Sequence, residues 1–172
     1  RPCCPAGSTP APETHVTCES KWVGEANDVG YLRFNLFMDP PTLFPFWQKA
    51  LTEFKDSSGI IIDLRGNAGG AFPVRRAIAE RLVTEPCVIW RQSGRRGVVE
   101  VRLAPPSRTF EAPVVVLVDE MSASSSEELA GGLQALGRAS VVGVRTPGNV
   151  LVAEVVPLPD GVSFEEGAAA MI

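Results

Sequence analysis

The chain has 172 residues, of which 45% are hydrophobic and 21% are charged. This length and composition predict one folded domain with a buried core and exclude overall disorder. The 16 basic and 20 acidic residues give a net charge of -4, which argues against a nucleic-acid binder that works by neutralising phosphates. The longest strongly apolar run, residues 114–118, is far too short to cross a bilayer.

Neutral nitrogen bases are scarce in this sequence. It contains one histidine, His15, and three lysines, Lys21, Lys49 and Lys55, and every other basic residue is an arginine. Arginine stays protonated in proteins and cannot accept a proton. A reaction that needs a nitrogen base must therefore use one of these four side chains or a group outside this sequence.

The cysteines are Cys3, Cys4, Cys18 and Cys87. Their spacing matches no zinc pattern, because the adjacent Cys3 and Cys4 cannot form a C-x-x-C hook. Disulfide bonds in an oxidising compartment and free thiols are both compatible with this arrangement. A metal site is not expected.

The N-terminal end of the chain differs in composition from the rest. Residues 1–14 carry four prolines and no hydrophobic periodicity, which predicts an extended segment. We expect residues 1–20 to be a linker or the remnant of an upstream segment. Residues 21–172 are expected to form the folded core, truncated at its C-terminal end.

The core begins with a strand and a helix. Residues 29–37 alternate apolar and polar side chains, as a half-buried strand does. Pro40 and Pro41 are expected to end this strand. Apolar residues then recur at three- and four-residue spacing, which predicts a helix over residues 42–55 with Thr42 as its N-cap.

Strands and helices alternate along the rest of the chain. Residues 60–64 and 113–118 are short apolar runs, typical of strands that are covered on both faces. The alternation predicts an α/β layered fold with a largely parallel central sheet. The further expected elements are strands at 60–64, 88–91, 98–103, 113–118, 140–144 and 150–157 and helices at 73–83 and 125–136.

A glycine-rich loop follows the strand at 60–64. Residues 63–70 read DLRGNAGG, and their three glycines leave several backbone N–H groups unobstructed near a helix start, a geometry suited to an oxyanion or a phosphate. The loop fits neither nucleotide-binding glycine pattern. A plain structural turn is the alternative.

A serine-rich connection follows the strand at 113–118. Residues 121–127 read MSASSSE, and a serine at this place lies at the positive end of the following helix, where an alkoxide or oxyanion is favoured. Ser124 and Ser125 each stand three residues before a glutamate, which matches the capping box. Helix capping is therefore the alternative, and both roles are possible if another serine caps and Ser124 stays free.

Four collinear motifs carry a resemblance to a known family. They are GYLRF at 30–34, IIIDLRGNAGG at 60–70, VVVLVDEMSASSSEELAGGLQALGRASVVG at 114–143 and TPGNVLVAEVVPLPDG at 146–161. Together they resemble the S41 family of serine peptidases, which includes C-terminal processing proteases, tricorn-core-like peptidases and relatives of a retinoid-binding interphotoreceptor protein. The resemblance implies a ClpP/crotonase-like fold, in agreement with the α/β expectation.

The resemblance also implies an active site. The family's catalytic serine corresponds to Ser124, and its oxyanion donors correspond to the backbone amides of Ser125 and of Gly70, with Gly69 beside it. It implies a serine endopeptidase that cleaves polypeptides near their C-termini, held along a sheet edge by β-augmentation. No metal or organic cofactor is implied.

The sequence departs from the family pattern at the general base. In the processing-protease branch a lysine follows the T-x-G element, but here Asn149 follows Thr146-Pro147-Gly148. Ala153 stands where that branch has a supporting glutamine. Because no lysine occurs after Lys55, a shift of register within the loop cannot restore the pair.

Three explanations remain open for this missing base. The base is a histidine from an upstream segment outside the chain, as in the tricorn-like branch; or the chain is a non-catalytic peptide-, lipid- or retinoid-binding module; or one of the four nitrogen bases within the chain reaches Ser124. A crotonase-like acyl-CoA enzyme is a further alternative class. Glu127 and Glu128 are expected to be charges at a helix N-terminus, and Arg65 and Arg138 to be structural ion-pair partners.

The family resemblance carries expectations about the whole protein. It implies a PDZ or helical domain upstream and a periplasmic, secreted or cell-envelope location. Polypeptides are the expected partners, and nucleic acid is not. The oligomeric state is not predicted.

Overall fold

Five strands form the central sheet of the computed structural model, which describes residues 15–94, 97–157 and 163–171, with the backbone alone for 152–157 and 163–171. Its order is β1-β2-β3-β6-β7. β1 is antiparallel to β2, and the other neighbours are parallel, so the predicted, largely parallel sheet is confirmed. The strands are β1 (Cys18–Val23), β2 (Val29–Phe34), β3 (Gly59–Asp63), β6 (Val114–Val118) and β7 (Ala139–Gly143).

A second sheet contains four antiparallel strands in the order β5-β4-β9-β8. They are β4 (Cys87–Gly94), β5 (Gly97–Leu103), β8 (Leu151–Pro157) and β9 (Ser163–Met171). β4 and β5 form the hairpin that the sequence predicts. β1 and β9 were not predicted, and β1 begins at Cys18, inside the range expected to be a linker.

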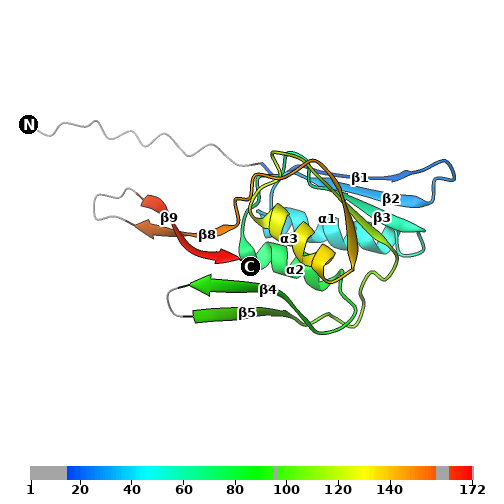
Figure 1. Ribbon diagram of the computed structural model, residues 1–172. Coiled ribbons are helices and arrows are strands. Elements are labelled where there is room, and N and C mark those ends of the chain that lie inside the picture. Colours follow the sequence, from blue (N-terminus) through cyan, green and yellow to red (C-terminus); the bar gives the residue numbers. More distant parts are fainter. Residues whose placement is uncertain (1–14, 95–96, 158–162, 172) are drawn as a thin grey trace, which may run out of the picture.

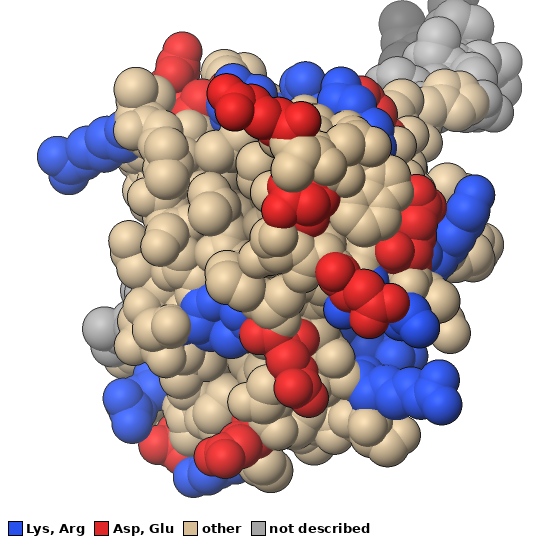
Figure 2. All heavy atoms as spheres, turned by 90° about the vertical axis from the view of Figure 1, so that its right-hand side faces the viewer, with Lys and Arg blue, Asp and Glu red and all other residues tan. Residues whose placement is uncertain are grey.

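Three helices lie between the central sheet and the β4–β5 hairpin (Figure 1). They are α1 (Pro40–Glu53), α2 (Phe72–Glu80) and α3 (Ser125–Ala135). No helix among the described residues is long and apolar enough to span a membrane. On the face drawn in Figure 2, acidic and basic side chains alternate and neither sign forms a continuous patch.

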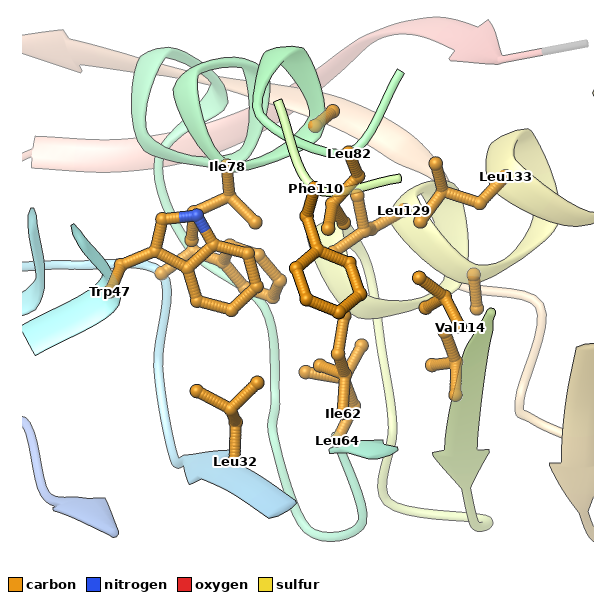
Figure 3. Packing of buried hydrophobic residues seen from close by; sticks show 14 of the residues in the cluster. Leu32, Trp47, Ile62, Leu64, Ile78, Leu82, Phe110, Val114, Leu129 and Leu133 are labelled. Carbon is orange, nitrogen blue, oxygen red and sulfur yellow. The ribbon is translucent and has the colours of Figure 1, made fainter. Parts of the chain in front are cut away.

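The core lies between the helices and one face of the central sheet. Leu32 and Ile62 of the sheet are fully buried, and Trp47 and Leu129 of the helices are buried against the same cluster (Figure 3). On the opposite face, Ile61, Val115 and Leu117 are partly buried, whereas Gly59 and Asp63 are buried. The described helices pack on one side, so the expectation that these strands are covered on both faces is met only in part.

The start of α1 corrects a prediction. Thr42 is not the N-cap, because the helix begins at Pro40 after Asp39, which is the N-cap with a φ of 48°. Pro40 and Pro41 occupy the first turn, where no N–H is needed and the fixed φ of proline suits a helix. The prolines that were expected to end a strand thus begin a helix.

Cys18 and Cys87 are free thiols, and burial raises the pKa of both. Cys3 and Cys4 lie outside the described residues. Disulfide pairing between Cys18 and Cys87 is therefore excluded in this structure.

Candidate active site

Two loops meet at the carboxyl edge of the central sheet, one after β3 and one after β6. The Leu64 amide donates to the carbonyl of Leu117 at 2.9 Å, which continues the β3–β6 pairing into the loops. The Ser122 hydroxyl donates to the carbonyl of Leu64 at 2.8 Å. The Gly66 amide donates to Asp119 Oδ1 at 2.9 Å. Hydrogen bonds from both backbone and side chains therefore fix the two loops against each other.

Asn67 joins both loops to the sheet. Its Nδ2 donates to the carbonyl of Phe34 at the end of β2 (2.8 Å), and its Oδ1 accepts the amide of Gly69 at 2.9 Å. Its backbone carbonyl accepts the Ala123 amide at 3.0 Å and the Ser126 hydroxyl at 2.8 Å. The residue is fully buried, so these bonds satisfy polar groups that water cannot reach.

The two glycines predicted as part of the site have backbone conformations and neighbours that require glycine. Gly69 has a φ of +103° and Gly70 a φ of +138°. A Cβ on Gly69 would lie 2.7 Å from Ser124 Cβ, and one on Gly70 would lie 2.6 Å from the carbonyl oxygen of Phe37. The glycine loop therefore lies directly against Ser124 at Gly69 and against the Phe37 backbone at Gly70, and a side chain at either glycine would displace the loop.

The amides of Gly70 and Ser125 are available to a ligand. Among the described residues, neither amide donates to a protein acceptor. The Phe37 amide donates at 2.8 Å to the carbonyl of Gly69, which shares its peptide group with the Gly70 N–H and so fixes that N–H. The Ser125 hydroxyl donates to the carbonyl of Gly70 at 2.8 Å. This bond holds the two amide-bearing residues together.

Ser124 itself adopts a strained backbone conformation. Its φ of 52° and ψ of -116° fall outside the regions that a non-glycine residue favours, which costs on the order of 1–3 kcal/mol. It stands at the N-cap of α3 and forms a capping box with Glu127, whose carboxylate accepts the Ser124 amide at 3.0 Å. The serine side chain faces the amide of Glu127 in this box but makes no side-chain cap hydrogen bond of normal geometry.

Glu127 also brings the third predicted segment to the site. Its other carboxylate oxygen, Oε1, accepts the amide of Gly148 at 2.6 Å. Asn149 follows immediately and is exposed. The expectation that Glu127 is only a charge on a helix end is therefore incomplete, because Glu127 is 9% exposed and links two loops.

The comparison with known families agrees with this arrangement of loops. The profile of peptidase family S41 matches residues 28–171. The chain belongs to this family.

Relatives with known names are carboxyl-terminal processing proteases. The protease of Picosynechococcus sp. is 34% identical over 133 residues, which is 77% of this chain and 32% of that protein. The processing protease CtpB of Bacillus subtilis is 33% identical over 151 residues, 87% of this chain and 31% of that protein. The chain thus spans about a third of the length of the curated relatives it matches.

A solved S41 structure confirms the fold. The photosystem II D1 C-terminal processing protease superposes with a TM-score of 0.77 at 30% identity, over 91% of this chain and 43% of that chain. The predicted ClpP/crotonase-like architecture of the S41 family is therefore the architecture of this chain.

Two of the three lysines within this S41 core lie beside acidic neighbours, and Lys49 is exposed on α1. Lys21 pairs with Glu19 at 2.6 Å, and Lys55 lies 3.6 Å from Asp56. None of the three lysines is hydrogen-bonded to Ser124 in the described part of the chain. His15 is exposed, and its carbonyl accepts the side-chain amide of Asn35.

The two arginines expected to form ion pairs differ from each other. Arg65 binds Asp63 through Nε (2.9 Å) and Nη2 (2.7 Å), and Tyr31 donates to the same carboxylate at 2.7 Å. Burial of Asp63 opposes its ionisation, but the bonds from Arg65 and Tyr31 lower its pKa to about 2. Arg138 forms no ion pair among the described residues. Its half-buried guanidinium is surrounded by backbone carbonyls and donates to three of them.

Sequence reasoning missed three residues that build the site. Asp119 could have been found, because it follows an apolar strand at the same sheet edge as the glycine loop. Asn67 lies inside the predicted loop, but no pattern indicates its bonds. Arg75 on α2 carried no signal at all.

Proposed function

We propose that this chain is the catalytic core of a serine endopeptidase in which the Ser124 hydroxyl is the nucleophile. The observation that carries the proposal is the strained backbone of Ser124 beside the unpaired amides of Gly70 and Ser125. Strain of this kind in a non-glycine residue concentrates at functional sites. Two backbone donors fixed by rigid elements are suited to the oxyanion of a tetrahedral intermediate.

The reaction proposed is acyl transfer. Ser124 Oγ forms a bond to the scissile carbonyl carbon, its proton passes to a general base, and the carbonyl oxygen becomes an oxyanion held by the amides of Gly70 and Ser125. The base returns the proton to the leaving amine as the C–N bond breaks. Water then hydrolyses the acyl-enzyme by the same steps, which restores the free serine.

The general base is proposed to come from outside this sequence. Asn149 occupies the position of the lysine in the processing-protease branch, and its neutral amide cannot accept a proton. The lysines of the chain are engaged elsewhere or exposed on α1. A histidine on a segment beyond these 172 residues is the base that the tricorn-like branch of the family would supply.

The proposed substrates are extended polypeptides, which the protein would cleave near their C-termini. The named relatives are carboxyl-terminal processing proteases. β8 is the outer strand of the second sheet and begins two residues after Asn149, so a peptide paired to its edge would pass close to Ser124. We propose a location in the periplasm, the cell envelope or the extracellular space, with which the named bacterial and chloroplastic processing proteases are compatible.

A fluorophosphonate probe tests the nucleophile on the longest natural form of the protein. We expect covalent labelling of the wild type and none of Ser124→Ala. Ser140→Ala is the matched control, because Ser140 is exposed on β7. Labelling that survives in Ser124→Ala would refute the assignment.

One observation favours a second candidate function. Asn149 removes the base of the processing-protease pattern, as expected of a scaffold that binds peptides without cleaving them. This alternative predicts no labelling at high probe concentration, together with equal affinity of the wild type and Ser124→Ala for a C-terminal peptide. Labelling of the wild type would exclude it.

A further inference from the structure

A buried ion pair lies behind the candidate oxyanion hole. Arg75 of α2 contacts Glu128 of α3, and their side chains are 2% and 4% exposed. The guanidinium lies 4.3 Å from the ring centre of Trp90 and 4.9 Å from that of Phe72. Burial lowers the pKa of Arg75 to about 10, so the guanidinium is still protonated at neutral pH.

This pair is costly to keep. Removing two charges from water costs solvation free energy, and the attraction between the charges offsets this cost only in part. Proteins with apolar residues of the same volume at such positions are often at least as stable. In addition, Nε and Nη2 of Arg75 are buried without a hydrogen-bond partner among the described residues. A role other than stability is therefore needed to explain the pair.

The position of the pair indicates this role. The Arg75 amide binds the carbonyl of Ala71, and the Glu128 amide binds that of Ser124, so each partner lies one turn after its helix begins. Each helix start carries one of the two unpaired amides, Gly70 just before α2 and Ser125 in α3. The ion pair therefore joins α2 and α3 one turn from the two helix starts.

Arg75 also reaches the site directly. Its Nη1 lies 3.5 Å from the Ser125 hydroxyl, at the limit of a hydrogen bond, and that hydroxyl donates to the Gly70 carbonyl at 2.8 Å. A charged group behind Ser125 favours the orientation in which its hydroxyl accepts from Arg75 and donates to Gly70. The contacts thus run without interruption from Glu128 to Gly70.

We propose that Arg75, held by Glu128, is a positioning residue that sets the distance between the Gly70 and Ser125 amides of the oxyanion hole. This inference rests on the proposed function of Ser124. Arg75 touches no reacting atom. Its effect is expected in the transition state, where the oxyanion forms, and not in the binding of an uncleaved peptide.

The test compares a transition-state analogue with a substrate in the longest natural form of the protein. A peptidyl boronic acid adds to the serine and places an oxygen at the oxyanion position, whereas an uncleaved peptide bound to Ser124→Ala does not. We expect Arg75→Met to lower boronate affinity and kcat by about tenfold or more. The effect should stay smaller than the roughly 10²- to 10³-fold loss caused by removing a whole oxyanion donor. Peptide affinity of Ser124→Ala and Ser124→Ala/Arg75→Met should be equal.

Two further variants separate positioning from folding. Arg76→Met is the matched control, because Arg76 is the exposed neighbour and pairs with Glu80 on the surface. Arg75→Met/Glu128→Leu replaces both charges with apolar groups and is expected to stay folded. The proposal requires this double variant to lose boronate affinity as well.

The possible results are distinguishable. Boronate affinity that is equal in the wild type and in both Arg75 variants would overturn the positioning role alone. A parallel loss of boronate and peptide affinity would show a merely structural role and overturn it too. A wild-type protein that reacts with neither boronate nor fluorophosphonate would overturn the proposed function, and the positioning role with it.

Discussion

The carboxylate of Glu127 accepts the amide of Gly148 at 2.6 Å while its other oxygen accepts the amide of Ser124. One buried side chain thus ties the loop after β7 to the candidate nucleophile. The geometry of the base position at Asn149 depends on a residue 22 places earlier in the chain.

Loss of the Glu127 carboxylate should loosen this loop. Glu127→Ala leaves the amides of Ser124 and Gly148 without their acceptor in a part-buried site, and we expect the free energy of unfolding to fall by about 1–2 kcal/mol. Glu127→Gln keeps one acceptor oxygen and should lose less. Urea denaturation followed by tryptophan fluorescence measures both values.

Glu120→Gln is the control for these two variants, because Glu120 is exposed in the preceding turn. It should change stability by no more than about 0.5 kcal/mol. Equal stability of Glu127→Gln and Glu127→Ala would contradict the two-oxygen arrangement.

Alanine at Gly70 should be far more damaging than alanine at Gly66. Both glycines have positive φ, but a Cβ at Gly70 would meet the Phe37 carbonyl at 2.6 Å, whereas one at Gly66 would meet nothing within 4 Å. We expect Gly66→Ala to cost about 1 kcal/mol from backbone strain alone and Gly70→Ala at least about twice that. Thermal unfolding of the two variants side by side gives the difference.

Similar losses in both variants would mean that backbone conformation alone, and not close approach to Phe37, requires glycine at position 70. Phe37 pairs with Gly70 in an isolated β-bridge. With similar losses, contacts other than those with Phe37 would have to hold the glycine loop in place.

Asp63 should make stability depend on acid pH. Its pKa is lowered from 3.8 to about 2 in the folded protein. Between these two pH values the folded state therefore binds fewer protons than the unfolded state. The contribution, about 2 kcal/mol, is present above pH 4 and is lost as the pH falls towards 2. Unfolding measured from pH 2 to pH 7 tests this.

Asp63→Asn should flatten this part of the pH profile. It should also lower stability at neutral pH, because Arg65 would then face a neutral amide in place of the carboxylate. Asp56→Asn, at an exposed site 3.6 Å from Lys55, should leave the profile unchanged. An unaltered acid slope in Asp63→Asn would assign the dependence to other carboxylates.

A lysine at position 149 should supply the absent base. We expect Asn149→Lys to raise the rate at which Ser124 of the 172-residue chain reacts with a fluorophosphonate by about 10²-fold, the lower end of general-base effects. The rate should increase with pH as the lysine deprotonates. Asn149→Gln adds no base and serves as control.

No gain in Asn149→Lys would show that the loop held by Glu127 does not aim position 149 at the serine. Ser124→Ala/Asn149→Lys must remain unlabelled, because otherwise the introduced amine itself reacts with the probe.

The two site loops were predictable from the sequence for a physical reason. Each follows a short apolar strand, and parallel strands bring their carboxyl ends to one edge. Gly69, Gly70 and Ser124 were therefore placed correctly at this edge of the sheet: Gly69 lies against Ser124, and the Gly70 carbonyl accepts the Ser125 hydroxyl. Their chemical roles remain predictions.

The start of α1 could not be predicted from the same signals. Proline indicates both a strand end and a first helical turn, and only the left-handed conformation of Asp39 decides between them. The missed strand β1 has charged residues at alternate positions, Glu19 and Lys21, because it is an edge strand with exposed side chains.

Arg75 was invisible in the sequence because helices ordinarily carry arginine on the surface. Its burial depends on the ring of Phe72 one turn earlier on α2 and on two groups from elsewhere in the chain, the Glu128 carboxylate and the ring of Trp90. Such tertiary compensation leaves no local pattern.

The bonds made by the side chain and carbonyl of Asn67 have a consequence for how the molecule opens. Its side chain is anchored to the end of β2 and its carbonyl to the start of α3, so neither loop can separate without disturbing the sheet. The hydrogen-bonded amides of both loops, unlike the unpaired amides of Gly70 and Ser125, should therefore exchange with solvent at the rate of the central strands, as one cooperative unit. The catalytic region of this fold would then be as slow to open as its interior.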